Sequence, residues 1–262
     1  PAERTIDALA PESTAPVQDA YACISFGSEK FRRDIAETLR QLTRHIAEAA
    51  YAGRIIGFQL SYGAYNEWIP WGLNTGKFVD FNPQYIERFR AWLKVKYRDD
   101  AALAKAWNMP GAKLSAALPF AGKNPREQAP AAGRFHDPAQ MMQLLDSREF
   151  ATFLVSDTQI FFADVLKQAT GGRALVGVYA GANYQYQDLA RLLAADAIDF
   201  FCSSTGYADR GINGVTYDQG FTLESLRLHH KLYCHDADIR TYLFPANKVD
   251  HFGITTDFGR LP

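Results

Sequence analysis

The chain has 262 residues, of which 47% are hydrophobic, so it is long enough to bury a large core within one domain. Its 28 Lys and Arg residues nearly balance 29 Asp and Glu residues, and this balance excludes a broad electrostatic surface for nucleic acid or for an anionic membrane. Aromatic residues make up 13%, which favours a small, roughly neutral ligand that binds against ring faces.

The cysteines are too far apart, and too far from histidines, to suggest a metal site. We therefore expect no metal, no cofactor, and free, mostly buried thiols at Cys23, Cys202 and Cys234. No apolar run approaches the roughly 20 residues of a membrane span. We therefore expect a soluble protein. Because residue 1 is Pro and not Met, we also expect that the amino terminus has been processed or truncated.

The first predicted element is an amphipathic helix that Ser28 caps and that ends near Gly53. Its apolar stripe repeats at spacings of three and four residues, namely Phe31, Ile35, Leu39, Leu42 and Ile46. An apolar strand over residues 55–60 follows and runs into an aromatic loop. Asn82 and Pro83 then suit an N-cap and a first helical position, which predicts a second helix.

The middle of the chain contains a long connection. Residues 99–109 predict a short helix, and residues 110–137 are rich in Pro, Gly and Ala and predict a loop. Loops of this length inside a domain are usually functional or mobile. A long helix is predicted over residues 138–170, where Gly171 ends it.

Strands and helices alternate through the last third of the chain. Strands are predicted over residues 174–181, 198–205 and 232–238, with helices over 187–195 and 222–231 between them. This alternation is typical of βαβ units and a parallel sheet, so the predicted fold class is α/β. A (β/α)8 TIM barrel fits the length, and residues 1–262 would form one barrel domain or the larger part of one. The barrel is incomplete, because four strands are clear and only residues 21–26 and 241–244 are further candidates.

Polar and aromatic residues cluster where the predicted strands end. In parallel α/β sheets the functional groups lie at the carboxyl ends of the strands. The residues found there are Asn66, Glu67, Tyr179, Asn183, Tyr207, His235 and Asp236. Carboxylates beside aromatic rings are typical of a sugar site, so the sequence predicts a carbohydrate ligand.

Three stretches carry a resemblance to a known family. They are GFQLSYGAYNEWIPWG (57–72), FNPQYIERFRAWLKVKYRDDAALAKAWN (81–108) and LRLHHKLYCHDADIRTYL (226–243). Together they resemble glycoside hydrolase family 42, the β-galactosidase-like group within clan A of retaining glycosidases. The resemblance implies that residues 55–60 belong to barrel strand four and residues 232–238 to strand seven. It also implies a homo-oligomer, since relatives often assemble.

Two carboxylates are the candidate catalytic groups. A retaining glycosidase needs an acid/base and a nucleophile about 5 to 5.5 Å apart. Glu67 suits the acid/base, because burial beside aromatic rings would raise its pKa; the alternative is a surface glutamate that caps or pairs. Asp236 is the candidate nucleophile, and its alternative role is to pair with Arg240. The family pattern has Glu at the second position, so the shorter Asp could slow attack, favour inversion or leave a site that only binds sugar.

The remaining predicted site residues would contact substrate. Asn66 would hydrogen-bond a ring hydroxyl, with an ordinary turn asparagine as its alternative. His235 could orient the neighbouring carboxylate, with a core histidine as its alternative. The aromatic and amide candidates for sugar contacts are Tyr65, Trp68, Trp71, Tyr179, Asn183 and Tyr207.

The sequence thus predicts a retaining β-glycosidase of the β-galactosidase-like kind that hydrolyses terminal sugars. The alternative is a catalytically weak or inactive barrel, or a barrel fragment, that binds carbohydrate. A doubly wound sheet that binds a nucleotide is a third option, but no GxGxxG or GxxxxGK[ST] loop follows a strand.

Overall fold

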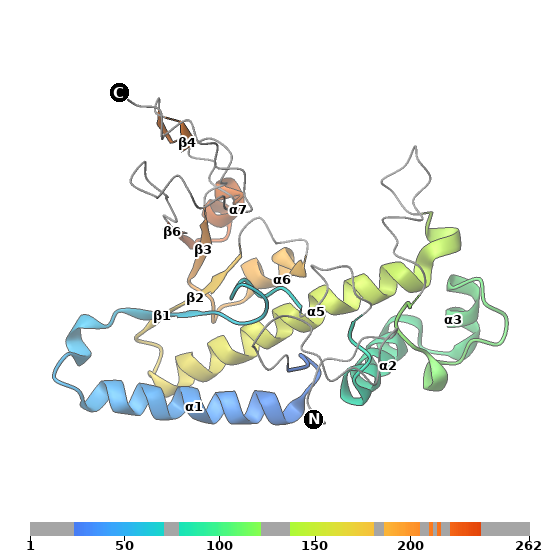
Figure 1. Ribbon diagram of the computed structural model, residues 1–262, viewed down its shortest axis with the longest axis horizontal. Helices are drawn as coiled ribbons and strands as arrows, with labels where there is room; N and C mark the ends of the chain where they lie inside the picture. Colours follow the sequence, from blue (N-terminus) through green and yellow to red (C-terminus); the bar gives the residue numbers. More distant parts are fainter. Residues whose placement is uncertain are drawn as a thin grey trace, which may run out of the picture.

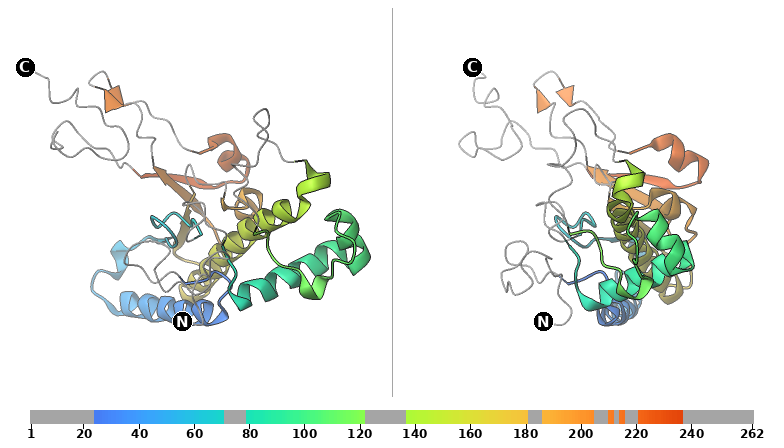
Figure 2. Two further views of the ribbon diagram at one scale, coloured as in Figure 1. Left: turned by 45° about the vertical axis from the view of Figure 1, so that its right-hand side comes forward. Right: turned by 90° about the vertical axis from the view of Figure 1, so that its right-hand side faces the viewer.

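The computed structural model describes residues 24–70, 79–121, 137–180, 186–204, 210–211, 214–215 and 221–236. These residues form an α/β structure in which helices pack against one four-stranded parallel sheet (Figure 1). The long helix α5 (Pro138–Ala169) runs along the sheet, and α1 (Glu29–Glu48) lies beside α5 (Figures 1 and 2).

The sheet confirms the predicted parallel strands. Its order is β1 (Gly57–Leu60), β2 (Leu175–Tyr179), β3 (Phe200–Ser204) and β6 (Leu232–Asp236), and every neighbouring pair is parallel. Consecutive strands are joined through helical segments, as βαβ units require. The residues that follow each strand therefore gather along one edge of the sheet.

The two faces of the sheet differ in exposure. One face is buried beneath the helices and carries Leu60, Val176, Val178, Phe201 and Ser203. The opposite face, called the inner face below, carries Gln59, Gly177, Tyr179, Phe200, Cys202, Leu232, Cys234 and Asp236. At its centre a Cβ on Gly177 would lie 2.1 Å from the Phe200 ring, so only glycine leaves room for that ring.

The helices match the predicted segments closely. The remaining ones are α2 (Pro83–Tyr97), α3 (Asp100–Ala106), α6 (Leu189–Ala194) and α7 (Leu223–Leu228). Short 3₁₀ turns η1 (Ala52–Arg54) and η3 (Leu114–Ala116) follow α1 and α3. The predicted caps are confirmed, because the Ser28 side chain accepts from the backbone N–H of Phe31 and the Asn82 side chain from that of Gln84.

One predicted stripe is wrong in part. Helix α1 buries Phe31, Arg32, Ala36 and Thr43, whereas Leu42 is 43% exposed. Arg32 is buried because its guanidinium pairs with α5: one Nη lies 2.7 Å from Asp157 Oδ2 and 2.8 Å from Thr158 Oγ1.

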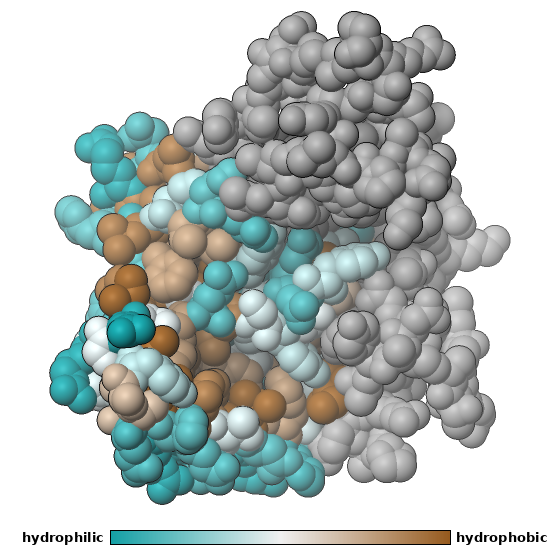
Figure 3. Space-filling view, turned by 60° about the vertical axis from the view of Figure 1, so that its left-hand side comes forward, coloured by the Kyte–Doolittle hydropathy of each residue, from teal (hydrophilic) through white to brown (hydrophobic). Residues whose placement is uncertain are grey.

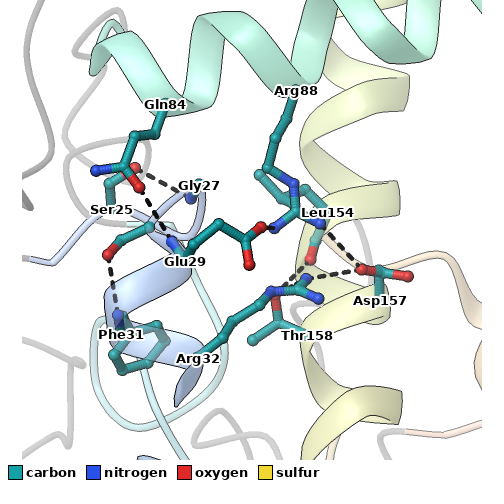
Figure 4. A network of polar contacts seen from close by, with 11 residues as sticks. Ser25, Gly27, Glu29, Phe31, Arg32, Gln84, Arg88, Leu154, Asp157 and Thr158 are labelled. Atoms are coloured by element: carbon teal, nitrogen blue, oxygen red, sulfur yellow. Dashed lines mark hydrogen bonds and ion pairs between the residues drawn. The ribbon is translucent and has the colours of Figure 1, made fainter. Parts of the chain in front are cut away.

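Polar contacts join three helices around Asp157 (Figure 4). Arg88 of α2 lies 3.3 Å from the same Asp157 oxygen and 3.2 Å from Glu29 Oε1 on α1. The backbone N–H of Glu29 also donates to the Gln84 side chain at 3.0 Å. These contacts fix α1, α2 and α5 relative to one another and so support the helical layer behind the sheet.

Several predictions fall outside the described residues or are changed. The 110–137 connection contains η3, and residues 122–136 lie outside the description. The candidate strand 21–26 is described only from residue 24, and residues 26 and 27 form a turn. The candidate strand 241–244 lies outside the description. An antiparallel ribbon of β4 (Arg210–Gly211) and β5 (Gly214–Val215) was not predicted.

Apolar side chains also reach the surface near the start of β1. Ile56 is 76% exposed and Ile55 is 41% exposed, and Figure 3 shows apolar surface among hydrophilic residues on that side of the molecule. Among the described helices, none combines the length and apolarity needed to cross a bilayer.

Candidate active site

The turn after β1 presents Glu67 and is held by the side chain next to it. Trp68 is 1% exposed, and its indole N–H donates to the carbonyl of Leu60 at 3.0 Å. Its backbone N–H donates to the carbonyl of Tyr62 at 2.7 Å. A backbone hydrogen bond of 2.9 Å from Ala64 to Ile69 closes the turn. Glu67 therefore sits on an anchored turn at the carboxyl end of a strand.

Aromatic packing fastens this turn to α1. The Trp68 ring lies 6.1 Å from the Tyr62 ring and 6.2 Å from that of Phe26, between centroids. Tyr62 in turn packs 4.6 Å from Phe31 at the start of α1. Such ring pairs add stability beyond the area they bury, so the turn is part of the hydrophobic core.

The backbone of the turn is strained. Tyr65, Asn66 and Trp68 have φ angles of 57°, 64° and 62°, in the left-handed region that non-glycine residues rarely adopt. Gly63 has φ 78°, and a Cβ there would lie 2.6 Å from the Ile69 carbonyl oxygen. Strained backbone of this kind clusters at functional sites in proteins, where the surrounding structure enforces it. Here the enforcing contacts are those of Trp68.

The charge of Asp236 acts on Glu67 although the two residues are far apart in the sequence. Burial raises the pKa of Glu67 above its ordinary value, and the negative charge of Asp236 raises that pKa further. Both effects favour the protonated carboxylic acid. The structure therefore brings the two predicted catalytic carboxyl groups within electrostatic reach.

Asp236 ends β6 on the inner face. It is in register with Ser204, and it shares the inner face with Cys234, which is in register with Cys202. Asp236 is exposed, so its carboxylate is open to a ligand on this side of the sheet. One carboxyl group thus stands at each outer strand, with β2 and β3 between them.

Comparison with solved structures finds glycosidases. The chain superposes on a β-galactosidase from the Antarctic haloarchaeon Halorubrum lacusprofundi with TM-score 0.55 and 17% identity, covering 87% of this chain and 30% of that protein. The catalytic domain of a β-amylase from Paenibacillus polymyxa gives TM-score 0.60 and 13% identity, covering 89% and 61%. A β-galactosidase from Bacillus circulans sp. alkalophilus gives 0.54 and 16%, covering 78% and 27%.

These likenesses concern the fold alone, because identity is low. The chain spans 30% of the length of the first of these β-galactosidases and 27% of that of the second. No protein-family model matches the sequence, and the search of curated proteins finds no match. The chain therefore has a glycosidase-like α/β fold that corresponds to a part of those enzymes.

Three predicted sugar contacts need correction. Trp68 is buried in the core and cannot stack on a sugar; it anchors the turn instead. Tyr179 lies on the inner face but is only 7% exposed, so its ring offers no open platform. His235 lies on the opposite face from Asp236, because successive strand residues alternate, and its ring packs 6.2 Å from that of Tyr233.

The other predicted contacts divide into two groups. Tyr65, 67% exposed, and Asn66, also exposed, flank Glu67 and are open to a ligand. Trp71, Asn183 and Tyr207 lie outside the described residues.

The sequence analysis missed Gln187. This side chain is 5% exposed, and its Nε2 donates to the carbonyl of Tyr179 at 3.0 Å and to that of Glu67 at 3.5 Å. It thereby links the end of β2 to the turn that carries Glu67. The prediction placed Gln187 inside a helix, whereas α6 begins two residues later with Asp188 as its cap. The signal available in the sequence was Asp188, a typical N-cap residue, which directly follows Gln187 and so places Gln187 before the helix.

The sequence analysis also missed residues of other strands that share the inner face with Asp236. Gln59, Cys202 and Cys234 share the inner face with Asp236. Period-two alternation along the strand predicts that Cys234 lies on the face of Asp236, whereas Gln59 and Cys202 on other strands are placed there only by the register. Within the described residues, no group of three or more His, Cys, Asp or Glu side chains could hold a metal ion.

A cavity of about 270 Å³ lies elsewhere in the fold. It is lined by Trp107, Asn108, Met109, Phe120, Gln140, Met141, Gln143 and Leu144, from α5 and from the segments around α3 and η3. None of these residues belongs to the predicted site, and nothing in their arrangement serves the two carboxylates.

Proposed function

We propose that residues 1–262 form one (β/α)8 barrel domain, or the larger part of one, which acts as a retaining β-glycosidase of the β-galactosidase-like kind. Glu67 is the acid/base and Asp236 the nucleophile. The observation that carries the proposal is the raised pKa of Glu67, caused first by burial and then by the charge of Asp236. An acid that donates a proton near neutral pH needs such a shift.

In the first step the Asp236 carboxylate attacks the anomeric carbon while the bond to the leaving group breaks. Glu67 gives its proton to the leaving oxygen, so the departing group leaves as a neutral alcohol. In the second step the ionised Glu67 takes a proton from water, and that water attacks the anomeric carbon. The bond to Asp236 then breaks, and both carboxyl groups return to their starting states.

The two roles follow from the different surroundings of the carboxyl groups. Glu67 lies on a partly buried turn, where the protonated form is favoured. Asp236 is exposed on the inner face and can meet the sugar as an anion. Asn66 and Tyr65 flank the acid and would bind sugar hydroxyls and stack on the ring, respectively.

The test compares aryl β-galactosides with good and poor leaving groups, using the full chain and two variants. Glu67→Gln should lower kcat about 10² to 10⁴-fold on a phenyl glycoside, the range for general acid catalysis. It should slow the first step far less on a dinitrophenyl glycoside, whose leaving group needs no proton. Asp236→Asn should slow both substrates alike, because the nucleophile acts on either.

A matched control is Glu149→Gln, which changes an exposed glutamate of α5 and should leave turnover unchanged. Proton NMR of the first product should show that the sugar keeps its β configuration. A parent chain that turns over no aryl glycoside refutes the proposal, and retained sugar binding in that chain would establish the carbohydrate-binding barrel. An α product would show inversion and would refute the retaining mechanism.

A further inference from the structure

Two cysteines stand side by side on the inner face of the sheet. Cys202 of β3 and Cys234 of β6 are in register on neighbouring parallel strands. Strand spacing places their Cα atoms about 4.8 Å apart, inside the 4.4 to 6.8 Å range that disulfides span. The backbone geometry therefore suits a bond between the two sulfur atoms.

The two thiols differ in access. Cys202 is 3% exposed, whereas Cys234 is exposed. Burial, together with the neighbouring Cys234 and Asp236, raises the pKa of Cys202 to about 12, so this thiol supplies little thiolate for a first attack. An incoming reagent would thus meet Cys234 first, and Cys202 would react second.

We propose that Cys202 and Cys234 form a reversible disulfide by exchange with a small-molecule disulfide such as oxidised glutathione. The Cys234 thiolate attacks one sulfur of the reagent, which releases one glutathione thiolate and leaves a mixed disulfide on Cys234. Cys202 then gives up its proton and attacks Sγ of Cys234, which releases the second glutathione. Two cysteine thiols are oxidised, one glutathione disulfide is reduced, and the two protons end on the two glutathione thiols.

Closing this bond would move β6. Side chains of in-register residues stand roughly perpendicular to the sheet, so the two Cβ atoms are about as far apart as the strands, about 4.8 Å. A disulfide needs its Cβ atoms about 3.8 Å apart. The bond would draw β6 toward β3 by about 1 Å, and Asp236 lies two residues beyond Cys234 on the same face.

Catalytic groups must be placed to within about 0.5 Å, and a shift of this size exceeds that tolerance. The disulfide would therefore lower glycosidase activity, a consequence that rests on the proposed function. Formation of the disulfide itself does not depend on that function, because it follows from strand register and thiol access alone.

The experiment treats the full reduced chain with oxidised glutathione, blocks the remaining thiols by alkylation and maps the peptides by mass spectrometry. The expected product is a cross-linked pair of peptides containing Cys202 and Cys234, lighter by two hydrogens, which dithiothreitol separates again. Cys202→Ser should instead retain glutathione on Cys234, and Cys23→Ser should leave the cross-link unaffected. A wild-type chain that keeps a stable glutathione adduct on Cys234, with Cys202 alkylated, would overturn the proposal.

The same samples test the consequence for the site. The oxidised chain should lose at least tenfold in kcat on an aryl β-galactoside and should regain it after dithiothreitol. Cys202→Ser should form no cross-link under the same treatment. Unchanged kcat in fully cross-linked chain would refute the control of activity. If the reduced parent is inert, the proposed function fails, and peptide mapping still decides whether the disulfide forms.

Discussion

Asp146 offers a sharp test of how the helical layer is stabilised. This α5 carboxylate is fully buried and accepts three hydrogen bonds: from Trp107 Nε1 at 2.6 Å, from Tyr97 Oη at 2.7 Å and from Lys96 Nζ at 2.9 Å. Asp146→Asn keeps the shape but removes the charge, and it turns one acceptor oxygen into an NH₂ group that faces donors.

The expected loss follows from these contacts. Removing one partner of a buried ion pair costs about 3 to 5 kcal/mol, and hydrogen bonds to charged groups contribute about 1.5 to 3 kcal/mol each. The Lys96 side chain is 30% exposed and can return to water, which lowers the cost. We therefore expect Asp146→Asn to lower the free energy of unfolding by about 3 kcal/mol.

The assay is equilibrium unfolding in urea, with the slope m compared between variants to confirm that only stability has changed. The control is Glu149→Gln, since Glu149 also pairs with Lys96 but is 58% exposed on its side chain. An exposed pair of this kind contributes at most about 1 kcal/mol. A loss for Asp146→Asn that is no larger than that of the control would refute the reasoning.

Three further predictions concern the candidate site. Asp236→Asn should lower the pKa of Glu67, measured by carboxyl ¹³C NMR, because it removes a negative charge; an unchanged titration would show that the two groups do not interact. Glu67→Gln should stabilise the chain at neutral pH but not near pH 4. A carboxyl group whose pKa is raised in the folded chain contributes stability at low pH, and that stability is lost as the pH rises. Equal shifts of the urea midpoint at both pH values would contradict this. Gln187→Leu should speed amide exchange in the Glu67 turn and lower the pKa of Glu67, whereas Gln143→Leu, which removes a similar amide-to-carbonyl bond, should change neither.

Local patterns predicted the elements well because each carried its own signal. Alternation of strands with capped helices was enough to predict the parallel order of the sheet. The caps at Ser28 and Asn82 marked helix starts directly. Errors arose where a partner far along the chain decides burial: periodicity assigns Arg32 to solvent, and only Asp157 on α5 makes its burial favourable.

The same limit governed the candidate site. Glu67 and Asp236 could be chosen from the sequence because each lies at the end of a predicted strand, and the effect of Asp236 on the pKa of Glu67 agrees with that choice. The roles assigned to Trp68 and His235 were wrong, because a ring beside a catalytic candidate can serve the core as well as a ligand. The sequence could mark Gln187 as the residue before a helix cap but could not show its role, because its two hydrogen-bond partners come from different strand ends.

Because the two carboxylates belong to the outer strands, the shape of the sheet affects the gap between them. If the four strands lay flat, three spacings would separate β1 from β6 by about 14 Å. The turn that carries Glu67 beyond β1 and the twist that sheets adopt both change that span, and retention requires a shorter gap between carboxyl groups than inversion does. A side chain in place of Gly177 would clash with the Phe200 ring, so that β2, β3 or the ring would have to shift. Strands β2 and β3 carry neither carboxylate, yet their packing would thus help to decide the anomeric configuration of the released sugar.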